Sequence, residues 1–247
     1  MALLWSTKKG DTQYEVRTAG NSRRLYTNHA FHSQYNPNHT FTGAMWDLLS
    51  IPALFYSTNL DRKLNRVLML GVGGGTAIHQ LQRLVSPSTL IGIEYDPVHI
   101  KVAKRFFKLS YPNLELIEAD AFKWVHNTRK QFDIIVDDLF VDAPQDPERP
   151  FAINALWMGR LHKRLSRDGL LIQNHLSTNT ALDVAKQYQN KYSSGLLFTT
   201  PHFANAILVL SKVKIDAKKS RPEVVRLIET HRTSPSPKPV FSVKQIF

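Results

Sequence analysis

The chain has 247 residues, enough for one α/β domain with additions and for a full hydrophobic core. It contains no cysteine, which excludes disulfides, thiolate zinc sites and a cysteine nucleophile. No apolar run is long enough to span a membrane, and the opening MALLW is too short for the apolar core of a signal peptide, so we expect a cytoplasmic protein without membrane contact.

The formal net charge of +12 is concentrated toward the C-terminus. Between residues 212 and 247, nine lysines and arginines stand against three acids, which accounts for half of the net charge. We expect residues 214–247 to form a basic helix and a flexible tail, because TSPSPKP at 233–239 contains three prolines. A basic tail can attract polyanions such as nucleic acid, and a merely solvated surface is the alternative.

Residues 1–43 are predicted to form a small β-sheet domain. Short alternating runs at 14–18 and 23–27 flank AGNS, which is typical of a hairpin, and a third run at 31–35 ends at the turn sequence NPN. Such a sheet is marginally stable alone. It should therefore pack on the main domain or on the second subunit of a homodimer.

The main domain is predicted over residues 44–213. It opens with an apolar pattern over 43–60, which predicts a helix interrupted near Pro52. Apolar residues at 67–70 then predict a strand buried on both faces. The glycines that follow this strand at once are Gly71, Gly73, Gly74 and Gly75.

A helical pattern comes after this glycine turn, and a second apolar strand at 90–93 ends at Glu94. The order strand, glycine turn, helix, strand and acid predicts the nucleoside-binding half of a doubly wound fold. The fingerprint of nicotinamide cofactors fails, because Thr76 stands where the third glycine is required. A purely structural glycine turn is the alternative.

The remaining segments alternate between strand and helix. This alternation predicts an α/β, doubly wound, mostly parallel Rossmann-like sheet that closes with an antiparallel pair. The predicted strands are 114–117, 132–136, 170–173, 196–199 and 206–210, and the predicted helices begin at Pro97, Phe122, Ala152 and Thr180. A proline-rich loop at 141–150 is expected to cover the strand ends, where lids occur.

Four acids stand where predicted parallel strands end, namely Glu94, Asp120, Asp137 and Asp138. Ligands of such sheets bind outside the carboxyl ends of the strands. We expect Glu94 to bind the ribose hydroxyls and Asp120 the amino group of adenine. The alternative is that each acid accepts only backbone N–H groups at a helix start, and we prefer that interpretation for Asp96, which precedes a proline.

Six segments together resemble a known family over residues 14–210. They are, in order, RRLYTNHAFHSQYNP, VLMLGVGGGTA, LIGIEYDP, ELIEADAFKWV, FDIIVDDLF and DGLLIQNHL. The chain resembles the spermidine synthase-like (polyamine aminopropyltransferase) group of class I AdoMet-dependent transferases. The resemblance implies S-adenosylmethionine (AdoMet) or its decarboxylated form as cofactor and a small amine or polyamine as substrate.

The resemblance also implies roles for single residues. Gln34 would lie near the sulfur of the cofactor, the glycine turn would face its amino-acid chain, and Glu94, Asp120 and Ala121 would hold the adenosine. Asp138 would bind or deprotonate the attacking amine, whereas Asp137 should point the other way. Asp142 and His175 are further substrate-binding candidates. No metal site is expected, because His29, His32 and His39 are joined by no acid or cysteine.

Two departures from the family pattern concern its substrate. Aminopropyltransferases carry an aspartate inside the glycine turn, where this chain has Gly74, and a Tyr-His-Glu triplet where this chain reads Phe41-Thr42-Gly43. An aspartate would hold the cationic chain of decarboxylated AdoMet but would repel the carboxylate of AdoMet. The sequence therefore favours methyl transfer to a small amine or related nucleophile. The alternatives are aminopropyl transfer and a non-catalytic nucleic-acid-binding or regulatory module.

Overall fold

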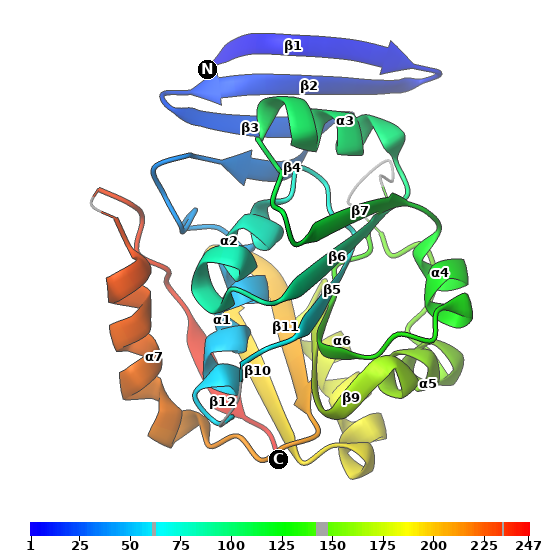
Figure 1. Cartoon of the computed structure of the whole chain (residues 1–247), viewed down its shortest axis with the longest axis vertical. Helices are drawn as coiled ribbons and strands as arrows, with labels where there is room; N and C mark the ends of the chain where they lie inside the picture. The colour runs from blue at the N-terminus through cyan, green and yellow to red at the C-terminus, as the bar shows by residue number, and fades with distance from the viewer. Residues whose placement is uncertain (61–62, 142–147, 234) are drawn as a thin grey trace.

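The computed structural model describes residues 1–60, 63–141, 148–233 and 235–247. Within these residues the chain forms two β-sheets, a small one at the N-terminus and a large one flanked by helices (Figure 1). The small sheet is antiparallel in the order β1-β2-β3-β4. Its strands are β1 (Ala2–Lys9), β2 (Thr12–Ala19), β3 (Ser22–Thr27) and β4 (Ala30–Tyr35).

The large sheet has the strand order β12-β10-β11-β9-β8-β5-β6-β7. The pairs from β9 to β7 are parallel, and β11, β10 and β12 add antiparallel pairs at the other edge. This arrangement confirms the predicted α/β class with a mostly parallel sheet. The strands are β5 (Arg66–Leu70), β6 (Thr89–Glu94), β7 (Leu114–Glu118), β8 (Phe132–Asp137), β9 (Leu165–His175), β10 (Ser194–Thr200), β11 (Phe203–Ser211) and β12 (Ser242–Gln245).

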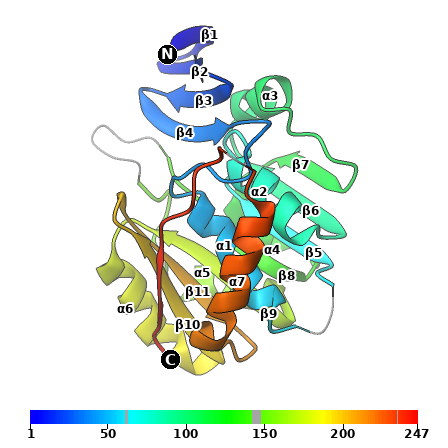
Figure 2. The same ribbon diagram turned by 90° about the vertical axis from the view of Figure 1, so that its left-hand side faces the viewer.

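Two hydrophobic cores lie on opposite faces of the large sheet. Alternate residues of β5 divide between them, with Val67 and Met69 in one core and Leu68 and Leu70 in the other. Helices α1, α2 and α7 cover the first face, and α4, α5 and α6 cover the second (Figures 1 and 2). The helices are α1 (Asp47–Ser57), α2 (Thr76–Val85), α3 (Pro97–Phe106), α4 (Ala121–Asn127), α5 (Ala155–Arg164), α6 (Thr178–Tyr188) and α7 (Ala217–His231), with a 3-10 turn at Gln189–Lys191.

The small sheet packs on the main part of the chain through α3. Val16 and Leu25 of the sheet are fully buried against Val98 and Val102 of that helix. Figure 1 shows α3 directly beside the strands of the small sheet. The packing places this sheet over the edge of the large sheet where the parallel strands end.

The sequence interpretation missed or misjudged three elements. Strand β1 was not predicted. Helix α1 is not interrupted at Pro52, because ten of its eleven residues are buried and this packing offsets the missing hydrogen bond. The C-terminal end is not a flexible tail, because Phe241 stacks on Phe198 and residues 242–245 form β12 beside β10.

The basic charge of the C-terminal segment is partly neutralised within it. Arg226 pairs with Glu223, and both Arg232 and Lys238 pair with Glu229. The division of the chain at residues 43 and 213 stays a prediction. None of the described helices has the length and apolar character that a membrane span requires.

Candidate active site

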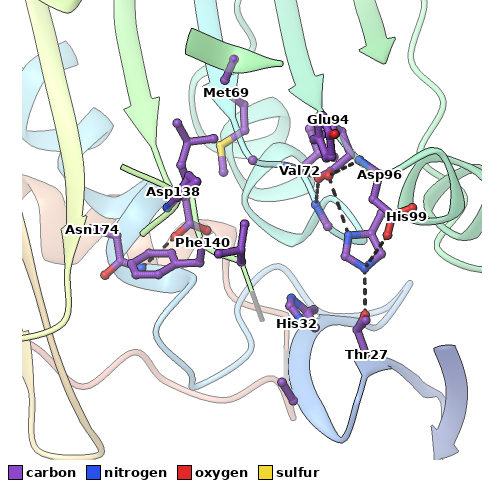
Figure 3. A pocket seen from close by; sticks show the side chains of 18 of the residues that line it. Thr27, His32, Met69, Val72, Glu94, Asp96, His99, Asp138, Phe140 and Asn174 are labelled. Carbon is purple, nitrogen blue, oxygen red and sulfur yellow. Dashed lines mark hydrogen bonds and ion pairs between the residues drawn. The ribbon is translucent and has the colours of Figure 1, made fainter. Parts of the chain in front are cut away.

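A cavity of about 1060 Å³ lies between the small sheet and the carboxyl ends of the parallel strands. This is the edge of an open α/β sheet at which ligands bind. Figure 3 shows two groups of polar side chains in it, with Glu94, Asp96, His99 and Thr27 on one side and Asp138 with Asn174 on the other. His32 lies between the two groups and enters from β4.

The glycine turn divides into two pairs with different surroundings. Gly71 and Gly73 line the cavity and have positive φ angles, which favour glycine. Gly74 and Gly75 do not line the cavity. A Cβ atom at Gly74 would lie 2.7 Å from Cβ of Ser33, and one at Gly75 would lie 2.4 Å from a methyl carbon of Leu109. Close packing also requires glycine in the first pair, since a Cβ atom at Gly71 would overlap the carbonyl oxygen of Asp138, and Gly75 has a positive φ angle as well.

Glu94 ends β6 and forms part of the cavity wall while being largely buried. Its Oε2 accepts hydrogen bonds from the backbone N–H groups of Val72 and Gly73 at 2.9 and 2.8 Å, and its Oε1 accepts one from Asp96 at 2.9 Å. An ionised carboxylate has about four acceptor positions. Glu94 therefore fixes the glycine turn and keeps the capacity to accept one further donor from the cavity.

Asp120 lies at the end of the neighbouring strand β7 and lines the same cavity, as does Ala121. Asp120 caps α4, because its Oδ1 accepts a hydrogen bond from the backbone N–H of Lys123 at 3.1 Å. The backbone contacts predicted for these acids are present, and their contact with an adenosine stays a prediction. Glu94 and Asp120 accept backbone N–H groups, and both also face the space where an adenosine was predicted.

A histidine that sequence reasoning missed joins the small sheet to this wall. Nε2 of His99 lies 2.8 Å from Oγ1 of Thr27 on β3, and its Nδ1 lies 3.8 Å from Oε1 of Glu94. Asp96 lies beside the same ring, with Oδ2 4.0 Å from Nε2, and accepts a 2.6 Å hydrogen bond from the hydroxyl of Tyr14. All five residues line the cavity. Strands β2 and β3 thus complete one end of the site.

Asp138 faces the cavity from the end of β8 and belongs to a chain of side-chain hydrogen bonds. Its Oδ1 accepts a bond of 2.7 Å from Nδ2 of Asn174, whose Oδ1 accepts one of 3.1 Å from Nδ2 of Asn205. Burial raises the pKa of Asp138 to about 6, and the charge of Asp137 adds to this rise, whereas the bond from Asn174 lowers it. Asp138 can therefore exchange a proton near neutral pH.

Asp137 points to the opposite face of the sheet and is fully buried. Burial acts to raise the pKa of its carboxyl, but Arg149, Gln173 and Trp157 together hold that pKa below its ordinary value. Arg149 donates at 2.8 Å, Gln173 at 2.7 Å and Trp157 at 2.8 Å. A carboxylate saturated in this way stabilises the fold and has no access to the cavity.

Besides Gly74 and Gly75, two further predicted contacts lie away from the cavity. Gln34 does not line it, and its side chain accepts a hydrogen bond from Arg24 at 2.9 Å. His175 is buried with Nε2 3.0 Å from Gln173, and burial lowers its pKa to about 4. Asp142 lies outside the described residues.

Neighbouring residues contact the site instead. His32, two residues before Gln34, lines the cavity, while Ser33 is buried and accepts a 2.7 Å hydrogen bond from the N–H of Gly74. Asn174 contacts Asp138 in place of His175. The motif segment that ends in QNHL contained Asn174, but its pattern did not indicate which side chain faces the cavity. No group of histidines and acids suited to a metal ion occurs among the residues that the structure describes.

Comparison with known proteins decides the family. A family described as a methyltransferase domain matches residues 61–219. The chain belongs to this methyltransferase domain family. The matched residues 61–219 include the glycine turn, Glu94, Asp120, Asp138 and Asn174.

Curated relatives of this methyltransferase domain protein carry the name polyamine aminopropyltransferase. The relative from Clostridium botulinum is 27% identical over 121 residues, which cover 46% of this chain and 41% of the relative. The relative from Thermococcus onnurineus is 25% identical over 147 residues, which cover 55% of this chain and 50% of the relative. The chain thus spans half or less of the length of these relatives.

Solved structures share the fold of this methyltransferase domain protein. A probable spermidine synthase from Corynebacterium glutamicum matches with a TM-score of 0.77 and 14% identity over 99% of this chain and 91% of the other. Human methyltransferase-like protein 13 in complex with SAH matches with a TM-score of 0.59 and 20% identity over 75% of this chain and 90% of the other. The predicted spermidine synthase-like, class I AdoMet-dependent fold is confirmed.

Proposed function

We propose that this protein transfers a methyl group from AdoMet to a small amine or a related nucleophile. The observation that carries the proposal is the arrangement of acids around one cavity. Glu94 and Asp120 line one end, Asp138 lines the other, and the glycine turn between them holds no acid at Gly74.

The residues of the cavity fit the adenosine part of AdoMet. Glu94 keeps an acceptor position for a ribose hydroxyl, and Asp120 follows the adjacent strand β7 by two residues at the same edge of the sheet. Gly71 and Gly73 bring the backbone of the turn to the cavity wall between the acids. Each charge-assisted hydrogen bond to the ligand would contribute roughly 1.5 to 3 kcal/mol.

The surroundings of Gly74 support AdoMet over its decarboxylated form. A side chain at this position would meet Cβ of Ser33 at 2.7 Å and the ring of Phe107 at 2.8 Å. The turn therefore has no room for the aspartate that aminopropyltransferases carry there. Without that negative charge, the carboxylate of AdoMet meets no repulsion from the turn.

Asp138 is the proposed catalytic residue. When bound, AdoMet supplies a methyl carbon made electrophilic by the adjacent sulfonium. Oδ1 of Asp138 is held by Asn174, so Oδ2 is left to accept the proton of the attacking nitrogen. With a pKa of about 6, this carboxyl is mostly ionised at neutral pH. Holding the nucleophile in line could lower the barrier by roughly 7 to 11 kcal/mol.

Aminopropyl transfer is the second candidate, and the names of the curated relatives favour it. It requires that the site prefer decarboxylated AdoMet and a diamine. The two candidates therefore make opposite predictions for one measurement.

Isothermal titration of the purified chain with AdoMet and with decarboxylated AdoMet decides between them. We expect AdoMet to bind more tightly. Tighter binding of the decarboxylated form would overturn methyl transfer in favour of aminopropyl transfer. If neither compound binds, the transferase proposal itself fails.

The polyanion contact and the homodimer stay predictions. Deleting residues 214–247 would not test the polyanion contact cleanly, because Val224 and Ile228 of α7 are buried in the core. Substituting the exposed Lys218 and Lys219 with glutamine leaves that packing intact. Retention on heparin, compared between this variant and the native chain, then reports on the polyanion contact.

A further inference from the structure

The end of the cavity that contains Asp138 is formed by three strands of the large sheet. Strands β8 and β9 end there, and the antiparallel strand β11 begins there, since Ala206 pairs with His175. Asp138, Asn174 and Asn205 consequently stand side by side across the sheet edge. This acceptor end is separate from the end that contains Glu94 (Figure 3).

Among the described residues that line the cavity, the polar groups of the acceptor end carry a single negative charge. Nδ2 of Asn205 donates to Asn174, and Nδ2 of Asn174 donates to Asp138. Both amides are neutral, and Asp138 is the acid of this end among the described residues that line the cavity. Within the described residues, the acceptor end therefore offers a carboxylate to one ammonium group, whereas a second one would meet only the amides of Asn174 and Asn205.

The rest of the acceptor end is apolar and largely aromatic. Phe203 and Leu176 remain 39% and 45% exposed at its rim, far more than core residues of their size. Phe31 and Trp46 line the cavity with ring centroids 5.0 Å apart in an edge-to-face arrangement. Phe140 follows Asp138 by two residues and lies beside it in Figure 3. A flat apolar group that covers such a surface removes it from water, and this burial favours binding.

We propose that the acceptor is a small amine with one nitrogen and one aromatic or bulky apolar group, rather than a linear diamine. The inference rests on the proposed function and assigns its substrate class. Asp138 receives the nitrogen, and the apolar part lies among the rings of the acceptor end. A diamine would place its second ammonium group near Asn174 and Asn205, whose side chains are neutral amides and not carboxylates.

Three matched amines test this assignment. Phenethylamine has one amine and a ring, butylamine has one amine and no ring, and 1,4-diaminobutane has two amines and no ring. We expect kcat/KM for transfer of labelled methyl from AdoMet to be at least about tenfold higher for phenethylamine than for either of the others. Equal or higher values for the diamine would overturn the inference.

Two variants test the surfaces separately. Phe203→Ala should lower kcat/KM for phenethylamine about tenfold and leave that for butylamine within about twofold, whereas Val225→Ala, an exposed position on α7, should change neither. Asn205→Asp should raise kcat/KM for the diamine relative to that for butylamine, because the variant adds a second carboxylate to the acceptor end. If the ratio of kcat/KM for the diamine to that for butylamine is the same in Asn205→Asp as in the native chain, the assigned role of Asn205 is wrong.

Direct binding separates this inference from the proposed function. Each amine is titrated into the chain saturated with S-adenosylhomocysteine, and the same order of affinities is expected. Failure of AdoMet to bind would overturn the proposed function, and amine titration of the free protein would then still test the acceptor end. If phenethylamine does not bind more tightly than the diamine in either form, the substrate assignment is wrong.

Discussion

The hydroxyl of Thr27 lies 2.8 Å from Nε2 of His99, and this contact joins the small N-terminal sheet to the wall of the cavity. Both side chains are buried, with Thr27 only 2% exposed. The other ring nitrogen of His99 faces Glu94 at 3.8 Å. The small sheet therefore does more than cover the site, because its position is linked to the acid that we expect to bind the ribose.

Thr27→Val should lower both the stability and the affinity for AdoMet. The valine leaves a buried ring nitrogen of His99 without its partner, which should reduce the free energy of unfolding by about 1–3 kcal/mol in urea titrations. Thr230→Val, at an exposed position of α7, serves as the control and should change stability by less than about 0.5 kcal/mol. Equal stability of the two variants would show that the contact is energetically unimportant.

Glu94→Gln should weaken AdoMet binding at least about tenfold in isothermal titration, since a charge-assisted hydrogen bond contributes roughly 1.5 to 3 kcal/mol. The variant also loses an acceptor for the N–H groups of the glycine turn, so its folding must be verified by circular dichroism. Glu115→Gln removes an exposed acid from the neighbouring strand β7 and should leave the affinity unchanged. Unaltered binding by Glu94→Gln would remove this acid from the proposed site.

Asp138 should govern the pH dependence of the reaction. Because burial raises the pKa of its carboxyl to about 6, kcat/KM should rise as the pH increases through about 6. Asp138→Asn should abolish most of the activity and should also remove this rise, while AdoMet still binds. Asp183→Asn on the exposed face of α6 is the matched control, and it should retain the native pH profile.

The same carboxyl should make the fold less stable at neutral pH than in mild acid. Its pKa is raised above the ordinary value of 3.8, so the folded chain binds the proton more tightly than the unfolded chain does. The resulting stabilisation is present below about pH 4 and is lost as the pH rises through about 6. Asp138→Asn should therefore be more stable than the native chain by about 1–3 kcal/mol at pH 7 and should match it at pH 4.

Gly74→Asp should fail to convert the protein into an enzyme for decarboxylated AdoMet. The new side chain would overlap Ser33 and Phe107, and overpacking of this kind typically lowers stability by about 1–3 kcal/mol. Gly159→Asp introduces the same side chain into open space on α5 and should be tolerated better. A stable Gly74→Asp variant that binds decarboxylated AdoMet tightly would contradict our account of the glycine turn.

The sequence alone predicted the order of strands and helices, the glycine turn, and the acids that end the parallel strands. These features follow from local patterns, because a strand buried on both faces consists of consecutive apolar residues and a tight turn needs glycine. The topology of such a sheet then brings Glu94, Asp120 and Asp138 to one edge. The sequence pattern is therefore sufficient to predict that these acids surround one site.

Only the tertiary structure decided which polar residues of β4 and β9 face the cavity, namely His32 and Asn174. The register of β3 and β4 shifts between Leu25 and Tyr26, so His32 is an extra residue, Ser33 reaches the glycine turn, and Gln34 turns to Arg24. On β9, strand alternation sends Asn174 to Asp138 and buries His175. Likewise, the closeness of Thr27 to His99 arises from the packing of the small sheet on helix α3, which is far from it in the sequence. A one-residue change of register moves every side chain of a strand to the other face of the sheet, and local sequence patterns do not predict such a change.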